Sequence, residues 1–167
     1  DYARAYGLPR RIVEQFAYRK YGFHGLSYTW VTRQTASFLG RPADQLRIVA
    51  CHLGTGGSSV AAIRDAASVD TSMGYSPLPG LVMSSRAGDL DPMLSLYLLA
   101  AYDYLPDDLL NMLNKKSGLL GISGLSSDIT DLVHQAEKEP DEQVRLAFDM
   151  YVHRLKKYIG SYVMMLS

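Results

Sequence analysis

The longest regular pattern of apolar positions lies at the C-terminal end of the chain. From Val144 to Leu166 apolar residues recur at spacings of three and four, which predicts one long amphipathic helix. Three shorter helices are predicted before it from their start signals. The first follows Asp91 and runs to about Tyr102, the second begins at Pro106 and ends near Lys115-Lys116, and the third is capped by Ser126 or Ser127.

Two more helices are predicted near the N-terminus. Residues 12–16 form a short apolar cluster after Pro9, which is typical of a brief helix. Ser27 is placed as the N-cap of a longer helix that reaches about Leu39, where Gly40 ends it.

Three short apolar runs, at residues 47–52, 58–64 and 67–72, lie between these helices and predict strands. A turn at Asp65-Ala66 joins the last two. Consecutive short strands favour an antiparallel meander. Strands followed by a run of helices predict an α/β layer structure whose other strands lie outside this chain. Residues 73–89, although rich in Gly and Pro, are predicted to form an ordered loop, because apolar residues such as Leu81 and Met83 anchor it.

Composition limits the classes of function. The 167 residues suffice for one ordinary domain, and 47% hydrophobic with 20% charged residues is typical of globular chains. Acidic and basic residues balance at 17 each, which argues against nucleic acid or an anionic membrane as a partner. The absence of a long apolar run and of a signal-peptide pattern predicts a cytoplasmic protein that spans no membrane.

Cys51 is the single cysteine, which excludes an internal disulfide and fits a reducing compartment. We expect it to be a small buried strand residue rather than a reactive thiol. The chain begins without Met and stops at Ser167 inside a periodic apolar segment. Both features favour a piece of a longer protein.

The stretch from Cys51 to Ser59, CHLGTGGSS, is the clearest candidate for ligand binding. Its glycines allow a ligand to approach the backbone closely, and exposed N–H groups with two serine hydroxyls can cradle a phosphate. His52 enters this loop, where it could donate to a phosphate oxygen or orient the loop. The chain has no ligand spacing typical of a zinc site.

Two further residues could act on an anion. His24 stands between glycines just before a predicted helix, where backbone N–H groups and partial positive charge favour negative charge. Arg86 lies in a Gly/Ser loop, and its guanidinium can clamp phosphate or carboxylate. Taken alone, the residue pattern favours a partly buried, hydrogen-bonded histidine at position 24, and for Arg86 it favours a surface residue paired with Asp89 or Asp91.

A set of motifs, in their order and spacing, resembles the acetate kinase family and its relative propionate kinase. The motifs are RKYGFHG at 19–25, HLGxG at 52–56, SVDTSMG at 68–74, PLxGL at 77–81, GDLDP at 88–92, NKKSG at 114–118 and KKYIG at 156–160. They extend over nearly the whole chain, so the resemblance is highly specific.

The resemblance implies two ribonuclease-H-like lobes of the actin-like ATPase type, with the active site between them. Residues 1–40 would end the first lobe, and residues 41–167 would form the first half of the second, nucleotide-binding lobe. The family transfers the γ-phosphoryl group of ATP to a short carboxylate, reversibly, giving an acyl phosphate and ADP, and it requires Mg²⁺. A homodimer is expected for the full-length protein.

The resemblance also assigns roles to individual residues. His24 and Arg86 would stabilise the transferring phosphoryl group. The residues His52, Leu53, Gly54, Thr55 and Gly56 would form the phosphate loop for the nucleotide. Asp128, Ile129 and Thr130 would line the adenosine pocket. No metal ligand is expected within this chain.

The chain departs from the family pattern at several positions. Thr55 stands where the family usually has Asn, Tyr28 where it often has His, Ser84-Ser85 where it has Gly-Thr, and Thr130 where it commonly has Arg. A catalytic Asp and a substrate-binding Arg would precede the chain, and a metal-binding Glu and an adenosine loop would follow it. We therefore expect the isolated chain to be inactive. Propionate as acceptor, another phosphoryl donor, a degenerate non-catalytic homologue and an unrelated phosphate-binding module remain alternatives.

Overall fold

The structure, a computed structural model, describes residues 2–167 and contains two compact units. The first comprises the residues up to Leu53 together with Ser59–Pro77 and Lys156–Ser167. The second comprises Gly54–Ser58 and Leu78–Leu155. Each unit is described by itself.

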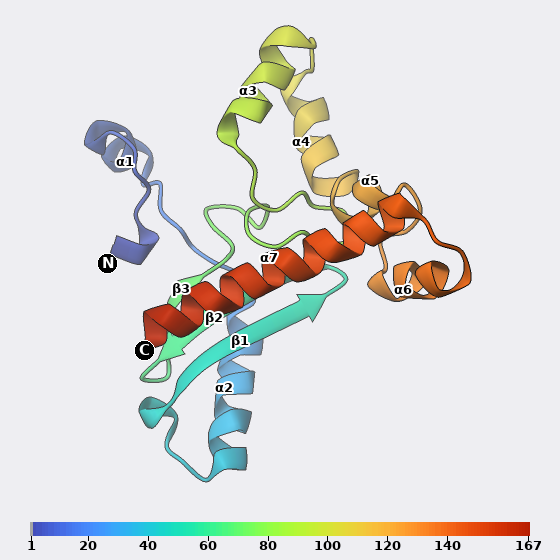
Figure 1. Cartoon of the computed structure of the whole chain (residues 1–167). Coiled ribbons are helices and arrows are strands. Elements are labelled where there is room, and N and C mark those ends of the chain that lie inside the picture. The colour runs from blue at the N-terminus through green and yellow to red at the C-terminus, as the bar shows by residue number, and fades with distance from the viewer. Residues whose placement is uncertain (1) are drawn as a thin grey trace. The chain divides into compact units, whose positions relative to one another are not determined.

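The first unit is built on a three-stranded sheet in the order β1-β2-β3 (Figure 1). The strands are β1 (Arg47–Gly54), β2 (Gly57–Arg64) and β3 (Ala67–Thr71). β2 and β3 pair antiparallel, with Ala61 opposite Thr71 and an irregularity between Ala62 and Ile63. The predicted meander is confirmed. Asp65 and Ala66 both have positive φ (53° and 59°), as a two-residue hairpin turn of this kind requires.

The two faces of this sheet are covered by different helices. α2 (Gly25–Leu39) packs Tyr28 and Val31 against one face, in a cluster with Ile48, Ala50, Ala61 and Ile63. On the other face Arg47 and Arg64 donate to the backbone carbonyls of Leu166 and Met165, at 2.8 and 2.7 Å. Those carbonyls end α7 (Glu142–Leu166), so the arginines satisfy acceptors that a helix terminus leaves without a partner.

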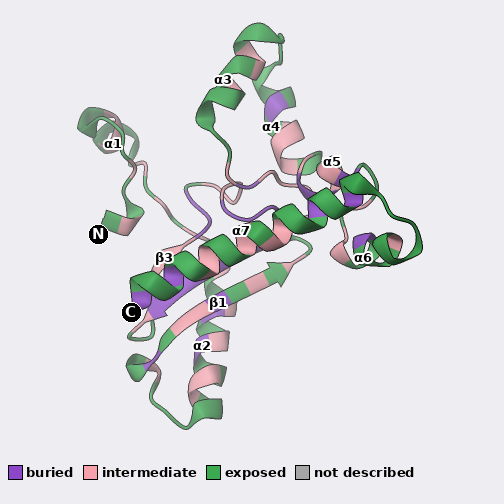
Figure 2. Ribbon diagram, viewed as in Figure 1, coloured by how far each residue is buried: buried purple, intermediate pink, exposed green. Residues whose placement is uncertain are grey.

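Burial of the strands follows their position in the sheet. β2 is central, and all but its last residue are buried, whereas Ala50 is the one buried residue of β1 and its other positions are intermediate or exposed (Figure 2). Ala50 faces α2, so its neighbour Cys51 projects to the opposite face and is exposed. The prediction that Cys51 is buried is therefore wrong, because β1 has only one hydrogen-bonded neighbour among the described strands.

The helices predicted from apolar pattern and start signals are confirmed. They are α1 (Arg10–Phe16), α2, α3 (Pro92–Ala101), α4 (Pro106–Lys115), α6 (Ile129–Lys138) and α7. Asp91 caps α3 by accepting from the Met93 N–H at 2.9 Å. α5 (Gly118–Ser123) and two short 3-10 helices, η1 (Tyr2–Arg4) and η2 (Ala43–Gln45), were not predicted.

Two predicted helix caps are wrong. α2 begins at Gly25 with His24 as its N-cap, and the Ser27 hydroxyl instead contacts His52. α6 is capped by Asp128, whose carboxylate accepts from the Thr130 N–H at 2.8 Å. Ser126 lies before the cap and accepts from the Asp128 N–H. Before α6 several capping residues stand close together and the local sequence does not rank them, whereas α2 starts at His24 without a side-chain cap.

The second unit has its own core, in which helices close over the loop of residues 78–91. Val82 from the loop packs with Leu119, Leu132, Val144 and Ala147. Its loop neighbours Leu81 and Met83 are each 1% exposed. The prediction of an ordered loop is confirmed, since its apolar residues are buried as deeply as those of the helices.

Gly118 shows how tightly the loop and the start of α5 fit together. Its φ is +62°, and a Cβ atom at this position would lie 2.2 Å from the Met83 carbonyl oxygen. Gly124 has the same backbone conformation (φ +65°) but open space around it. The pair separates the cost of the left-handed conformation from the cost of a steric clash.

We predict that Gly118→Ala destabilises the protein by roughly 2–5 kcal/mol, the sum of left-handed strain and overpacking. Gly124→Ala should cost only about 1–2 kcal/mol, because strain acts alone. The measurement is urea unfolding of both variants in the complete product of the reading frame that contains this chain, called the complete gene product below. Equal losses in the two variants would contradict the close packing.

Candidate functional site

His24 occupies a strained position at the start of α2. Its φ and ψ are 64° and 23°, a left-handed conformation that non-glycine residues seldom adopt. Such strain persists only where the surrounding structure holds it, and it concentrates at functional sites. The motif around His24 therefore fixes the direction of its side chain as well as its identity.

The His24 ring stacks on the His52 ring. Their centroids are 3.9 Å apart and the planes are inclined by 17°. His24 Nδ1 lies 2.8 Å from Ser59 Oγ, and His52 Nδ1 lies 3.0 Å from Ser27 Oγ. The two predicted site histidines, from α2 and β1, thus form one pair in which a serine holds each ring.

Ser59 connects this pair to the core of the first unit. It is fully buried, and its hydroxyl contacts both His24 Nδ1 and the Tyr28 hydroxyl. Ser58 is 3% exposed and donates to the Gly54 carbonyl oxygen. The prediction that these two hydroxyls cradle a phosphate is wrong, because both point to partners within the protein. The sequence reasoning missed Tyr28 as a site residue and missed the contact of Ser59 with His24. A signal existed, since Ser59, Ala61 and Ile63 alternate along one strand face.

Burial raises the pKa of Tyr28 to about 12. The side chain is 6% exposed, and loss of water disfavours the phenolate. Desolvation is the largest effect; the hydrogen bond with Ser59 and the backbone of His52 lower the pKa, and Cys51 raises it. Tyr28 therefore stays a neutral phenol throughout the physiological pH range. Partial burial also raises the pKa of the Cys51 thiol, so the exposed cysteine is mostly a thiol near neutral pH.

The glycine loop between β1 and β2 is a tight hairpin turn. Thr55 and Gly56 form the turn and are exposed, and Leu53 is 50% exposed. A Cβ atom at Gly56 would meet nothing within 4 Å. Open backbone of this kind lets a ligand approach the N–H groups directly.

A hollow of about 220 Å³ lies beside the start of α2. Aromatic rings, hydroxyl groups and glycines line it, and its lining includes no charged residue. The Thr71 hydroxyl borders this hollow, and its buried Oγ1 has no hydrogen-bond partner in the described part of the chain. An uncharged lining of this size suits a small ligand better than a triphosphate.

Arg86 lies in the second unit, half-buried in the loop that precedes α3. Its guanidinium contacts the Met83 sulfur at 4.0 Å, a weak contact. Its expected alternative partners are engaged elsewhere, since Asp89 pairs with Arg154 and Asp91 caps α3. Arg86 thus keeps its donors for a ligand better than a surface ion pair would allow.

Arg154 of α7 joins the two ends of this loop at Gly80 and Asp89, a pair that we call the loop neck. Its Nη1 donates to the Gly80 carbonyl at 3.0 Å and lies 3.4 Å from the Asp89 carboxylate. Gly80 and Asp89 also bond each other, because the Asp89 N–H donates to the Gly80 carbonyl and the Gly80 N–H to the Asp89 carboxylate. The loop that carries Arg86 is therefore held at both ends.

The predicted adenosine residues lie at the start of α6 in the second unit. The Asp128 carboxylate is occupied as the helix cap, Ile129 packs against the core, and Thr130 is exposed. Within the first unit the structure brings His24 and His52 together. Arg86, the turn residues Gly54–Gly56 and the start of α6 belong to the second unit.

Residues 2–167 contain no group of three or more His, Cys, Asp or Glu side chains arranged to hold a metal ion. In that same range no helix combines the length and apolar character needed to cross a bilayer.

We predict that Arg154→Met loosens the loop neck, because charge-assisted hydrogen bonds to Gly80 and Asp89 are lost. Hydrogen exchange at the Asp89 amide should accelerate by about tenfold, which corresponds to about 1.4 kcal/mol of local opening. Arg145→Met is the matched control, since its ion pair on the same helix is exposed to solvent. Unchanged exchange in Arg154→Met would show that the neck does not depend on this side chain.

We predict that Tyr28 makes the protein sensitive to alkali. The folded pKa is about 12 and the ordinary value is 10.0, so the unfolded chain releases this proton first. The contribution of neutral Tyr28 to the free energy of unfolding is fully present below pH 10. It is lost as the pH rises to 12, which lowers the free energy of unfolding by roughly 2–3 kcal/mol. Tyr28→Phe should flatten this part of the curve of unfolding free energy against pH. Tyr2→Phe, a change at a residue that is 93% exposed, should leave it unaltered, and equal curves for all three proteins would refute the assignment.

Comparison with known proteins supplies the family. The model of the acetokinase family matches residues 1–167. Acetate kinase of Bacillus subtilis is 49% identical over 162 residues, which cover 97% of this chain and 40% of that protein. Acetate kinase of Bacillus velezensis is 48% identical over the same shares. The chain spans about 40% of the length of the curated relatives it matches.

Solved structures agree. Acetate kinase of Porphyromonas gingivalis superposes with a TM-score of 0.94 at 38% identity, covering 99% of this chain and 41% of that one. A propionate kinase from Francisella tularensis superposes with a TM-score of 0.91 at 37% identity, covering 98% of this chain and 41% of that one. The α/β fold with its three-stranded meander is thus a partial fold of these kinases. With the family model matching from end to end, this chain belongs to the acetokinase family.

Proposed function

We propose that the complete gene product transfers the γ-phosphoryl group of ATP to acetate, giving acetyl phosphate and ADP in a reversible reaction. The observation that carries the proposal is the stacked pair of His24 and His52. Both histidines stand in motifs that match the family, and the fold holds them with dedicated serine contacts. Membership of the family implies use of ATP and ADP.

In the transfer step a carboxylate oxygen of the acceptor forms a bond to the γ-phosphorus. The bond from that phosphorus to the β,γ-bridging oxygen breaks, and this oxygen leaves on ADP. Charge on the phosphoryl oxygens must be stabilised during the step, and positioned donors do most of this work in phosphoryl transfer. We assign this role to His24 and Arg86.

The hairpin turn from His52 to Gly56 is the proposed phosphate-binding loop for the nucleotide. Its exposed turn residues and the open space around Gly56 support this role. Asp128, Ile129 and Thr130 are the proposed lining of the adenosine pocket. Because the Asp128 carboxylate caps α6, its contribution there would be structural, whereas the exposed Thr130 hydroxyl is available to a ligand.

Magnesium is expected with ATP, and residues 2–167 contain no group of three or more His, Cys, Asp or Glu side chains that could hold a metal ion. We therefore propose that its ligands lie outside this chain, and we assign no step of the reaction to the metal. The division proposed for the two lobes remains after residue 40, with residues 1–40 in the first lobe and 41–167 in the second.

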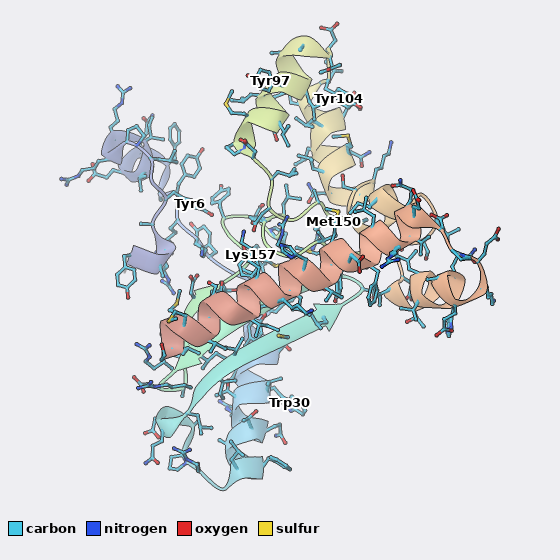
Figure 3. The ribbon with its side chains drawn as sticks, in the orientation of Figure 1. Tyr6, Trp30, Tyr97, Tyr104, Met150 and Lys157 are labelled. Carbon is cyan, nitrogen blue, oxygen red and sulfur yellow. The ribbon has the colours of Figure 1, made fainter. Side chains whose placement is uncertain are left out.

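We also propose a cytoplasmic homodimer. Its support is α3, which has no charged residue between Pro92 and Ala101 and no buried one. Leu94, Leu96 and Tyr97 are 52%, 55% and 58% exposed, and Figure 3 shows Tyr97 projecting from this helix. An apolar helix face of this extent is typical of a protein interface.

Propionate is the second candidate acceptor. The observation in its favour is the Francisella tularensis propionate kinase, whose TM-score of 0.91 is close to the 0.94 of the acetate kinase. Acetate and propionate differ by one methylene group, and discrimination on that scale is typically about 10–200-fold.

The test is hydroxamate formation by the complete gene product with ATP, Mg²⁺ and either acetate or propionate. We predict activity that falls by about 10²–10³-fold in Arg86→Ala, as for loss of one transition-state donor. Arg145→Ala, at an exposed arginine of α7, is the control and should keep full activity.

Each result has a definite meaning. Faster turnover of propionate than of acetate would make propionate the proposed acceptor in place of acetate. Absence of turnover with both acids would favour a degenerate homologue or another phosphoryl donor. An active Arg86→Ala variant would remove Arg86 from the proposed machinery while leaving the reaction in place.

A further inference from the structure

Three side chains form a continuous line of hydrogen bonds that ends on the His24 ring. Tyr28 of α2 contacts the Ser59 hydroxyl of β2, and Ser59 Oγ lies 2.8 Å from His24 Nδ1. All three residues belong to the first unit. Tyr28 and Ser59 are 6% and 0% exposed, so water does not compete for these bonds. Each hydroxyl carries one proton, and the direction of the line decides which ring nitrogen of His24 is protonated.

The hydrogen bond of Tyr28 sets the direction of donation along this line. Ser59 Oγ is the hydrogen-bond partner of the Tyr28 hydroxyl within the described part of the chain, and the Tyr28 side chain is only 6% exposed. The phenol keeps its own proton, since burial raises its pKa to about 12. A buried O–H group needs an acceptor, and the Ser59 oxygen lies within hydrogen-bond distance. Tyr28 is therefore the donor and Ser59 the acceptor.

The same reasoning about donors and acceptors applies to the Ser59 hydroxyl. Ser59 accepts from Tyr28 and has one proton to place. His24 Nδ1 is its other partner, so Ser59 donates to that nitrogen. A neutral imidazole that accepts at Nδ1 carries its proton at Nε2. The opposite direction would leave the buried phenol proton of Tyr28 aimed at the Ser59 proton.

We propose that Tyr28 and Ser59 are positioning residues that fix His24 as the Nε2–H tautomer. The ring then offers an N–H donor, rather than a lone pair, to an anion at Nε2. A lone pair aimed at a phosphoryl oxygen would repel it, whereas an N–H group stabilises the developing charge. The catalytic consequence rests on the proposed function, but the tautomer itself does not.

This assignment also gives Tyr28 a specific part to play. A phenol has a single proton, and here the buried Ser59 oxygen is the acceptor beside it, so its direction of donation is fixed. An imidazole at this position could donate or accept through either nitrogen and would not impose a direction by itself. Tyr28 thus fixes the direction of hydrogen-bond donation, and Ser59 extends that direction to His24.

The test is the ring ¹⁵N spectrum of the complete gene product labelled at histidine, with His24→Gln used to assign the His24 signals. We predict a protonated Nε2 and an unprotonated Nδ1 for neutral His24 in the wild-type protein. A protonated Nδ1 would overturn the proposal. This measurement needs no activity, so an inactive protein with the expected tautomer would refute only the proposed function.

Ser59→Ala should convert the single tautomer into a mixture and lower kcat by about 10-fold or more, with the KM for ATP changed by less than about threefold. Ser72→Ala is the matched control. Ser72 is also a buried serine of the first unit, and its hydroxyl accepts from the Val60 N–H without touching His24. A Ser59→Ala protein with the wild-type tautomer would contradict the role of Ser59.

Tyr28→Phe provides a second variant that retains the ring and Ser59, in case Ser59→Ala does not fold. With the phenol donor gone, Ser59 can turn either way, so the ¹⁵N spectrum should again show a mixture. Tyr162→Phe is the control, at a tyrosine of α7 that is 2% exposed. A pure Nε2–H tautomer in Tyr28→Phe would show that Tyr28 does not set the direction.

Discussion

The central strand β2 is the constraint on which the rest of the first unit depends. It is covered on both faces, so each of its side chains must fit a packed environment. Ala61 and Ile63 meet this demand with apolar contacts to α2. Ser59, on the same face, meets it with hydrogen bonds, because a buried hydroxyl without partners would be costly. The same burial that stabilises the sheet thus produces the contact that holds His24.

The stacked histidines follow from this packing and from the geometry of the two elements that carry them. The left-handed backbone at His24 starts α2 and directs the ring toward the sheet. His52 lies two residues beyond Ala50 on β1 and therefore shares the face that α2 covers. Each ring is held through Nδ1 by a serine, His24 by Ser59 of β2 and His52 by Ser27 of α2, which fixes the pair more firmly than stacking alone.

In the second unit the groups that need hydrogen-bond partners belong to the backbone. The loop of residues 78–91 has few regular hydrogen bonds, so its carbonyls find partners in neighbouring elements. Arg154 satisfies Gly80, and the close approach of Gly118 lets the Leu119 N–H reach the Met83 carbonyl at 2.8 Å. Arg86 gains a fixed support without using its own guanidinium to build it. The side chain that we propose to contact a ligand is thereby spared a structural role.

The sequence by itself determined the type and order of the elements. Apolar periodicity, the Asp91-Pro92 start and the Asp65-Ala66 turn are local signals, and the helices and the meander they predicted are present. The family motifs likewise pointed to the histidines and to Arg86. What local signals could not decide were the choice among adjacent cap residues and the side of a strand that is covered. For that reason the cap at Ser27, the burial of Cys51 and a phosphate-facing Ser59 were wrong.

Only the tertiary structure decided which polar groups meet. Tyr28 and Ser59 stand 31 residues apart in the chain, and no spacing rule links a helix residue to a strand residue at that distance. Their contact exists because α2 lies across the face of β2 that carries Ser59. The pairings of Arg154 with Gly80 and of Arg47 with the end of α7 arise in the same way. Hydrogen-bond partners in the interior are set by packing, since a buried polar group must bond to whatever the fold brings beside it.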